Sequence, residues 1–211
     1  MSATTVLRAA VLQSRDVFTL REPRKSDVEL LLERQRESRF SYAEVGATLG
    51  APPAGYTVDR TRLGLGAGRE TFENAACALA GWRQFETGWT RLLPAESPVS
   101  EGAAVCVVAR HLGFYSLNPA RIVRVLDDRG RYPGYRRYGF VYGTLPAHSE
   151  RGEERFCVEL LPDGSVWYDL YSFARGGSTL VRAGYPVRRL LQRRFARDSG
   201  RAMLRAVSEG R

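Results

Sequence analysis

The chain has 211 residues, a formal net charge of +9, 44% hydrophobic residues and a mean hydropathy of −0.31. These values exclude a disordered tail protein, and no apolar run approaches the roughly 20 residues that a bilayer-spanning helix needs. The three cysteines form no C-x-x-C pair, which excludes a disulfide scaffold and a cysteine-rich zinc module. We therefore expect a globular cytoplasmic protein that has no transmembrane segment, binds no metal ion and needs no cofactor.

The N-terminal part of the chain predicts a tail followed by a helix. Residues 1–22 have two short apolar patches without clear periodicity, and we expect them to be loosely ordered. Residues 23–208 are expected to form one domain. Within it, the capping-box residues Ser26 and Glu29 predict the start of a helix that runs to about Arg39. A loop rich in glycine and proline follows.

The next segment predicts a strand and a long helix. A strand over 56–65 runs into a Gly-x-Gly-x-Gly segment at residues 64–68. Such glycines before a helix also occur in phosphate-binding loops, but no second β-α-β unit follows, which favours a tight strand-to-helix turn. Apolar residues at three- and four-residue steps then predict a helix over about 70–92.

After residue 98 the apolar period changes to two, which predicts a meander of antiparallel strands. The sequence Pro162-Asp163-Gly164 is typical of a type I turn with a bulge, and it pairs Leu161 with Ser165. This register gives the hairpin one apolar inner face that another element must cover. The strands are expected near 103–111, 120–126, 138–145, 154–161 and 165–174, and the inner face consists of Phe156, Val158, Leu160, Val166, Tyr168 and Leu170.

A long helix after Pro186 is the expected cover. Apolar residues recur at four-residue steps from Val187 and form one face of this helix. Arginines recur at four-residue steps from Arg189 and lie about 200° round the helix from the apolar face. The arginines of this ladder should therefore point away from the sheet. The Ser199-Gly200 step is expected to loosen the helix. From residue 182 onward there are nine arginines and two acids, but few aromatic side chains for base stacking. Nucleic acid is therefore a disfavoured partner, and a solvated helix face is expected.

The order of these elements predicts an α+β fold: a curved antiparallel sheet that grips a long C-terminal helix, with additional N-terminal helices. This helix-grip arrangement is that of START-like and polyketide-cyclase-like proteins, in which the gap between sheet and helix is commonly a ligand cavity. The analogy does not assign a function.

A closer resemblance comes from the motifs read together. They are Leu63–Gly66, Trp82, Trp89, Pro119–Ile122, Tyr138–Pro146, Gly152–Phe156 and Gly184–Gln192. With these motifs the chain resembles the domain-of-unknown-function family 1990, found in bacteria and plants, from about Tyr42 to Ala206. The resemblance implies a helix-grip-like fold and brings no established activity.

The loop around residues 142–155 contains the densest set of reactive side chains. His148 with Glu153 or Glu154 is a candidate general acid/base pair, because imidazole titrates near neutrality and a carboxylate can orient it. Alternatively, the two glutamates pair with arginines such as Arg121 or Arg155 and only fix the loop. No third ligand is visible for a metal ion.

Three hypotheses for function follow. The first is a non-enzymatic protein that binds a small apolar or lipid-like ligand between the sheet and the last helix. The second is an enzyme of the cyclase, hydrolase or isomerase type that uses His148, Glu153 and Glu154. The third is an arginine-rich helix that binds nucleic acid or an anionic surface. Candidate ligand-binding residues are Arg121, Tyr142, Thr144, Arg155, Phe156, Val158, Tyr168 and Leu170.

Overall fold

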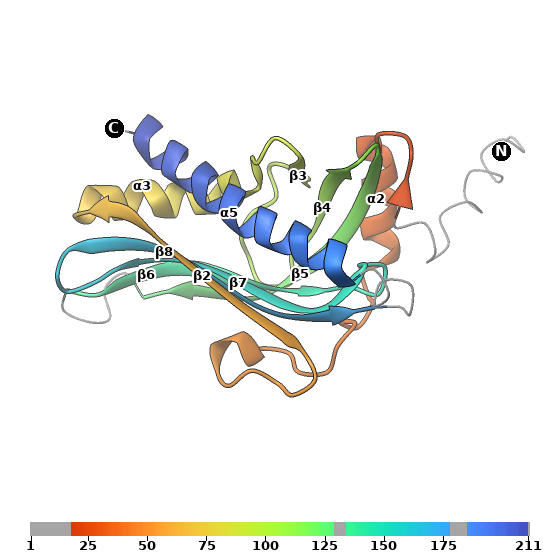
Figure 1. The fold of residues 1–211 in the computed structure, drawn as a ribbon, viewed down its shortest axis with the longest axis horizontal. Helices are drawn as coiled ribbons and strands as arrows, with labels where there is room; N and C mark the ends of the chain where they lie inside the picture. The colour runs from red at the N-terminus through yellow and green to blue at the C-terminus, as the bar shows by residue number, and fades with distance from the viewer. Residues whose placement is uncertain (1–17, 129–133, 178–184, 211) are drawn as a thin grey trace, which may run out of the picture.

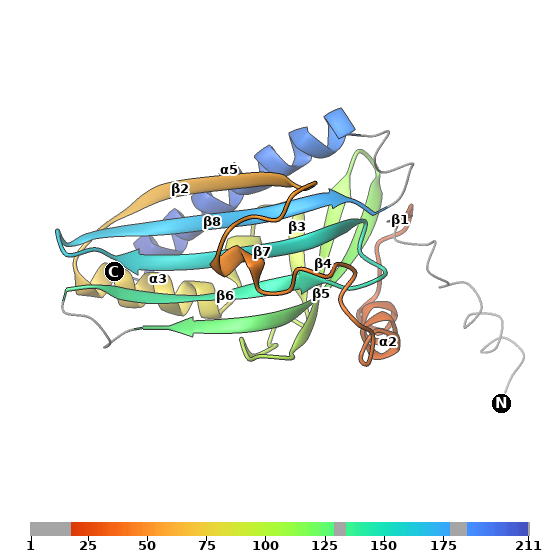
Figure 2. The ribbon, with the colours of Figure 1, turned by 90° about the horizontal axis from the view of Figure 1, so that it is seen from below.

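The computed structural model describes residues 18–128, 134–177 and 185–210. Eight strands form one antiparallel sheet, in the order β2-β8-β7-β6-β5-β4-β3, and β1 pairs with β5. Helices α3 and α5 lie on one face of this curved sheet, and the segment containing η1 lies on the other (Figures 1 and 2). This arrangement confirms the expected α+β fold with a long C-terminal helix.

The strands and helices have the following bounds. The strands are β1 (Phe18–Thr19), β2 (Thr57–Ala67), β3 (Thr90–Leu93), β4 (Ala104–His111), β5 (Phe114–Asp127), β6 (Arg136–Thr144), β7 (Glu150–Leu160) and β8 (Ser165–Gly176). The helices are α2 (Lys25–Arg34), η1 (Ala47–Leu49), α3 (Arg69–Ala80), η2 (Arg83–Phe85) and α5 (Tyr185–Glu209). The expected N-terminal tail falls mainly on residues 1–17, which lie outside the described residues.

The β7–β8 hairpin has the register that the sequence predicts. The backbone N–H of Leu161 donates to the Ser165 carbonyl at 2.9 Å, and that of Gly164 donates to the Leu161 carbonyl at 2.9 Å. Gly164 has φ +82°, the left-handed conformation that this turn requires. The pairing continues along both strands, and all six inner-face residues predicted for the hairpin are buried.

Helix α2 begins and ends differently from the expectation. The first turn is capped by the Asp27 carboxylate, which accepts from the Arg24 N–H at 3.0 Å, so the predicted Ser26 capping box is wrong. The helix ends at Arg34, before the expected end near Arg39. The Arg121 guanidinium, on β5, donates to carbonyls of the segment that follows. Its apolar side chains pack on the outer face of β4 and β5: Val28, Leu31 and Leu32 lie against Cys106, Val108 and Leu117.

The helix expected over 70–92 is wrong beyond Ala80. Trp82 adopts a left-handed backbone conformation, with φ 61°, and the chain continues as η2 and then β3. The indole of Trp82 is buried, and its N–H donates to the Ser97 carbonyl at 2.7 Å. The apolar residues beyond Ala80 are thus buried by tertiary contacts, and the helical spacing of the sequence does not decide their conformation.

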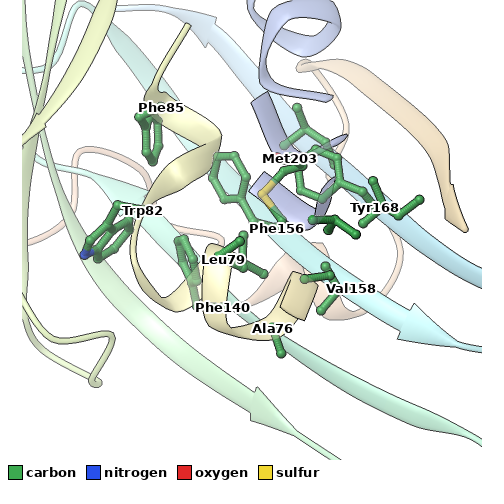
Figure 3. Packing of buried hydrophobic residues seen from close by; sticks show 14 of the residues in the cluster. Ala76, Leu79, Trp82, Phe85, Phe140, Phe156, Val158, Tyr168 and Met203 are labelled. Carbon is green, nitrogen blue, oxygen red and sulfur yellow. The ribbon is translucent and has the colours of Figure 1, made fainter. Parts of the chain in front are cut away.

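One half of the concave face of the sheet is filled by a packed core under α3 and the C-terminal half of α5 (Figure 3). The hydroxyls of Tyr168 and Ser199 lie 2.8 Å apart. At Gly200 an added Cβ would lie 2.9 Å from Leu63 Cδ2, so glycine permits a close approach of α5 to β2. The core includes Ala76, Leu79, Trp82, Phe85, Phe140, Phe156, Val158, Tyr168 and Met203. The expected loosening at Ser199-Gly200 is therefore wrong, because α5 runs unbroken through this step.

The arginine ladder of α5 is only partly directed to solvent. Arg197, Arg201 and Arg205 are exposed as expected. Arg189 instead turns toward the sheet and binds Asp59 on β2, with one nitrogen–oxygen distance of 2.8 Å. Among the described residues, no helix is both long and apolar enough to cross a bilayer.

Candidate ligand-binding site

A cavity of about 860 Å³ lies between the N-terminal half of α5 and the other half of the concave face of the sheet. Its volume falls within the range of roughly 300–1,000 Å³ that is common for small-molecule sites. Most of its wall is aromatic or aliphatic. The apolar lining residues include Phe18, Leu20, Phe85, Trp89, Val107, Phe114, Leu170, Val187, Leu191 and Phe195.

A row of polar side chains crosses the inner wall. The strand register places Asp59 beside Ser172, Ser172 beside Glu154, and Glu154 beside Tyr142, on the four adjacent strands β2, β8, β7 and β6. All four residues line the cavity. Because side chains at paired positions point to the same face, the sheet itself assembles this row from distant parts of the chain.

Glu154 is half-buried at the centre of this row. Its Oε2 accepts a hydrogen bond from the Tyr142 hydroxyl at 2.7 Å, and within the described residues it has no cationic partner. Burial raises the pKa of Glu154 to about 7; the Tyr142 hydrogen bond opposes this shift, and the charges of Glu150 and Asp59 add to it. The carboxyl group is therefore close to its midpoint of ionisation at neutral pH.

The first turns of α5 are fixed to the sheet by a polar cluster, which we call the α5 latch. The Glu150 carboxylate accepts from Arg188 at 3.0 Å and from Gln192 at 2.8 Å. Arg189 binds Asp59 as described above. Burial raises the pKa of Glu150 although Arg188 and Gln192 oppose the shift. The α5 latch consists of Asp59, Glu150, Arg188, Arg189 and Gln192, and all but Arg189 line the cavity.

His148 also lines the cavity. Its Nδ1 accepts from the Glu150 backbone N–H at 2.9 Å, and burial lowers the pKa of His148 to about 4. At neutral pH the ring is therefore neutral and carries its proton on Nε2. His148 is thus hydrogen-bonded to the backbone of Glu150 and lines the same cavity as Glu154, and it does not form the expected pair with Glu153.

The Glu153 carboxylate lies on the opposite face of the sheet from Glu154. It accepts from the Tyr42 hydroxyl at 2.8 Å, from the Gly46 N–H at 2.6 Å, and from the N–H and hydroxyl of Thr48 at 2.9 and 2.5 Å. Strand alternation places neighbouring residues on opposite faces. Glu153 therefore anchors the η1 segment to the sheet, which corrects its expected position beside His148.

Two candidate cations also lie away from the cavity. Arg121 donates to the carbonyls of Ser38 at 2.9 Å and Gln35 at 2.8 Å. Arg155 donates to the Thr48 carbonyl at 2.8 Å and to Asp169 at 3.0 Å. These placements correct the expectation that Arg121 and Arg155 face the ligand, because both guanidinium groups stabilise the outer side of the sheet.

The other candidate ligand-binding residues differ in whether they reach the cavity. Leu170, Tyr142 and Thr144 line the cavity. Phe156, Val158 and Tyr168 belong to the packed core and are fully buried. Their expected position on the cavity wall is corrected, because α3 and the C-terminal half of α5 cover that part of the sheet. Within the described residues, no group of three or more His, Cys, Asp or Glu side chains is placed to hold a metal ion.

Some of the residues that line the cavity could be predicted from the sequence pattern, and others could not. Glu150 and Glu154 follow from the hairpin register, because both lie an even number of residues before the inner-face Phe156. Asp59 carries no such signal, because its position depends on the pairing of β2 with β8 across a sequence separation of more than 100 residues. His111 and Trp89 meet at the cavity with ring centroids 5.6 Å apart, again only through the fold.

Among solved structures, the chain is similar to the hypothetical protein jhp0584 of Helicobacter pylori, with a TM-score of 0.46, 11% identity, and coverage of 82% of this chain and 96% of that one. It is also similar to Ara h 8.0201, with a TM-score of 0.45, 13% identity, and coverage of 70% of this chain and 98% of that one.

Relatives in sequence cover most of the chain. A UPF0548 protein of Dictyostelium discoideum is 33% identical, with 90% of this chain and 96% of that protein covered. A UPF0548 protein of Deinococcus radiodurans is 38% identical, with 90% and 99% covered. A third, from Arabidopsis thaliana, is 34% identical, with 73% and 75% covered. The model of the domain of unknown function DUF1990 matches residues 41–202. The chain therefore belongs to the DUF1990 family, as its motifs predict.

Proposed function

We propose that the protein binds a small, largely apolar molecule in the cavity under the N-terminal half of α5. The observation that carries this proposal is the cavity itself, about 860 Å³ in volume and walled mainly by aromatic and aliphatic side chains. A few polar groups stand together on one wall, which is the composition of sites that orient a mostly apolar ligand. Membership of the DUF1990 family assigns no activity to the protein.

Energetics also favour an occupied cavity. Apolar side chains that face a void lose the dispersion contacts that a close-packed interior provides. Phe195 and Leu191 on α5 and Leu170 on β8 line the space from opposite sides, while the α5 latch connects the helix to the sheet. An apolar ligand would supply the missing contacts, and its transfer from water would contribute about 25 cal/mol for each Å² of apolar area buried.

The enzyme hypothesis has less support. Glu153 is engaged on the outer side of the sheet, so of the three acid–base groups expected from the sequence only Glu154 and His148 reach the cavity with their side chains. His148 already accepts a backbone hydrogen bond through Nδ1. A catalytic role for Glu154 would appear as turnover that is lost in Glu154→Gln while ligand binding persists.

Two neighbouring leucines of α5 allow a matched test of the binding site. Leu191 lines the cavity, whereas Leu190 is 67% exposed and does not line it. The neutral fluorophore N-phenyl-1-naphthylamine, whose emission increases in apolar surroundings, should bind the wild-type protein saturably. Leu191→Trp fills the site and should weaken this binding at least about tenfold, a loss of about 1.4 kcal/mol.

The control is Leu190→Trp, which adds the same group to the outside of the same helix and should leave the titration unchanged. Equal binding by wild type, Leu191→Trp and Leu190→Trp would show that the fluorophore uses another surface. Absence of saturable binding by the wild-type protein would overturn the proposal.

A further inference from the structure

We infer that the ligand of this cavity carries a protonated amine that pairs with the Glu154 carboxylate. The inference rests on the proposed binding function and names the chemical class of the ligand: an apolar molecule with one ammonium group.

The first argument is the balance of charge on the cavity wall. Four acidic residues line the cavity: Asp59, Glu150, Glu153 and Glu154. The Glu153 carboxylate is hydrogen-bonded on the outer side of the sheet, and α5 supplies an arginine to two of the others: Arg189 to Asp59 and Arg188 to Glu150. Within the described residues, Glu154 receives only the neutral Tyr142 hydroxyl. One carboxylate of the wall is thus left without a counter-charge, and it lies at the centre of the polar row.

The second argument is the hydrogen bonding of that carboxylate. Its Oε2 accepts from Tyr142, and no described residue donates to Oε1. An ionised carboxylate beside apolar side chains is costly unless a charge and a donor meet it. An ammonium group supplies both in one contact, and such charge-assisted hydrogen bonds are stronger than neutral ones.

Other head groups fit less well. A carboxylate ligand at this position would be repelled by the Glu154 carboxylate itself, which has no counter-charge among the described residues. Arg193 lines the cavity and has no partner among the described residues, but its side chain is exposed, so water solvates its charge. An alcohol would donate a hydrogen bond to Glu154 but leave the charge unmatched.

The pairing predicts how affinity depends on pH. The titratable and charged side chains that line the cavity with Glu154 come from every element around it. They are Tyr142 on β6, Glu150 on β7, His148 just before β7, His111 on β4, Asp59 on β2 with its partner Arg189, and Arg188 and Arg193 on α5. Because burial holds the pKa of Glu154 near 7 in the ligand-free protein, an ammonium ligand must compete with a proton below that pH. Its affinity should therefore rise from pH 5 to pH 8, and then fall above about pH 10 as the amine itself loses its proton.

The test compares three probes with the same chain: octylamine, octanol and octanoate, each used to displace N-phenyl-1-naphthylamine at pH 8. Octylamine should bind at least about tenfold more tightly than octanol to the wild-type protein, because its ammonium group adds an opposite charge to the hydrogen bond that octanol can also donate to the carboxylate. Glu154→Gln should reduce this preference to about twofold or less. Glu159→Gln is the matched control, because Glu159 lies on the same strand and bonds to Arg62 and Tyr135 away from the cavity.

Each outcome decides a different claim. Equal or tighter binding of octanol or octanoate by the wild-type protein would overturn the inference, and so would a preference for octylamine that survives in Glu154→Gln. In both cases the fluorophore would still bind, and the proposed function would stand. A different outcome is that the fluorophore shows no saturable binding to the wild-type protein and native mass spectrometry detects no complex with the fluorophore or octylamine. The proposed function then fails, and the inference fails with it.

Discussion

Glu154 shows at the scale of one residue how the cavity couples stability to pH. Its pKa is raised from 4.5 to about 7 in the folded state. Between these values the folded protein keeps a proton that the unfolded chain releases, so an increase in pH destabilises the fold through this group, and the effect is complete above pH 7. Glutamine cannot ionise and avoids this penalty.

Glu154→Gln should therefore change stability in a pH-dependent manner. In ligand-free protein, the free energy of unfolding of the variant relative to the wild type should increase from pH 5 to pH 8. Urea denaturation at the two pH values measures this difference. A difference that is the same at both would show that Glu154 is not protonated above its ordinary pKa.

Glu153 differs from Glu154, because its carboxylate accepts hydrogen bonds from several groups on the outer side of the sheet. Glu153→Ala leaves the Tyr42 hydroxyl and the Gly46 and Thr48 N–H groups without an acceptor. We expect a loss of about 3 kcal/mol or more in the free energy of unfolding, since each unsatisfied buried donor costs about 1–3 kcal/mol. Urea denaturation checks this loss, with Glu37→Gln as the control because Glu37 has a side chain that is 93% exposed. A loss no larger than that of the control would contradict this role.

At the scale of elements, the α5 latch is expected to hold only the N-terminal half of α5. Asp59→Asn removes the negative charge that Arg189 meets, whereas the C-terminal half remains packed through Met203 and Val207. Backbone amides over 188–197 should then exchange with deuterium faster, and those over 200–208 should be unchanged. Hydrogen-exchange mass spectrometry measures both ranges, with the exposed Glu33→Gln as the control. Faster exchange along the whole helix would contradict a local latch.

The elements also differ in how well the sequence pattern predicts them. The β7–β8 hairpin was predictable because turn residues and strict alternation fix its register locally. The end of α3 was not, because the residues after it keep a helical apolar spacing while tertiary contacts decide their conformation. One such contact joins Trp82 to Phe140 on a distant strand, with ring centroids 4.8 Å apart. The orientation of Arg189 likewise depends on Asp59, which is 130 residues away in the chain.

At the scale of the whole molecule, the sheet has two functionally different halves. The half under α3 is filled by a core that includes Met203, and the half under the start of α5 encloses the cavity lined by Leu191. The alternation of apolar residues predicts the inner face as a whole. It does not show which half is filled, because that depends on where α3 and α5 lie. This explains why Leu170 lines the cavity whereas Phe156 does not.

This division predicts that stability and binding respond to different substitutions. Met203→Ala should lower the free energy of unfolding by about 2–5 kcal/mol, the usual cost of a core cavity, and should leave fluorophore affinity unchanged in the folded protein. Leu191→Trp should weaken fluorophore binding and leave the free energy of unfolding nearly unchanged. Thermal or urea denaturation, combined with fluorophore titration, measures both quantities. Loss of binding in Met203→Ala under conditions where it remains folded would contradict the division.

The most direct test of the account is a crystal structure of the protein with N-phenyl-1-naphthylamine. We expect the fluorophore to lie between Leu191 and Phe195 on α5 and Leu170 on β8, next to the polar row that contains Glu154. A fluorophore bound elsewhere, or a helix α5 that has closed onto the sheet and left no cavity, would contradict it.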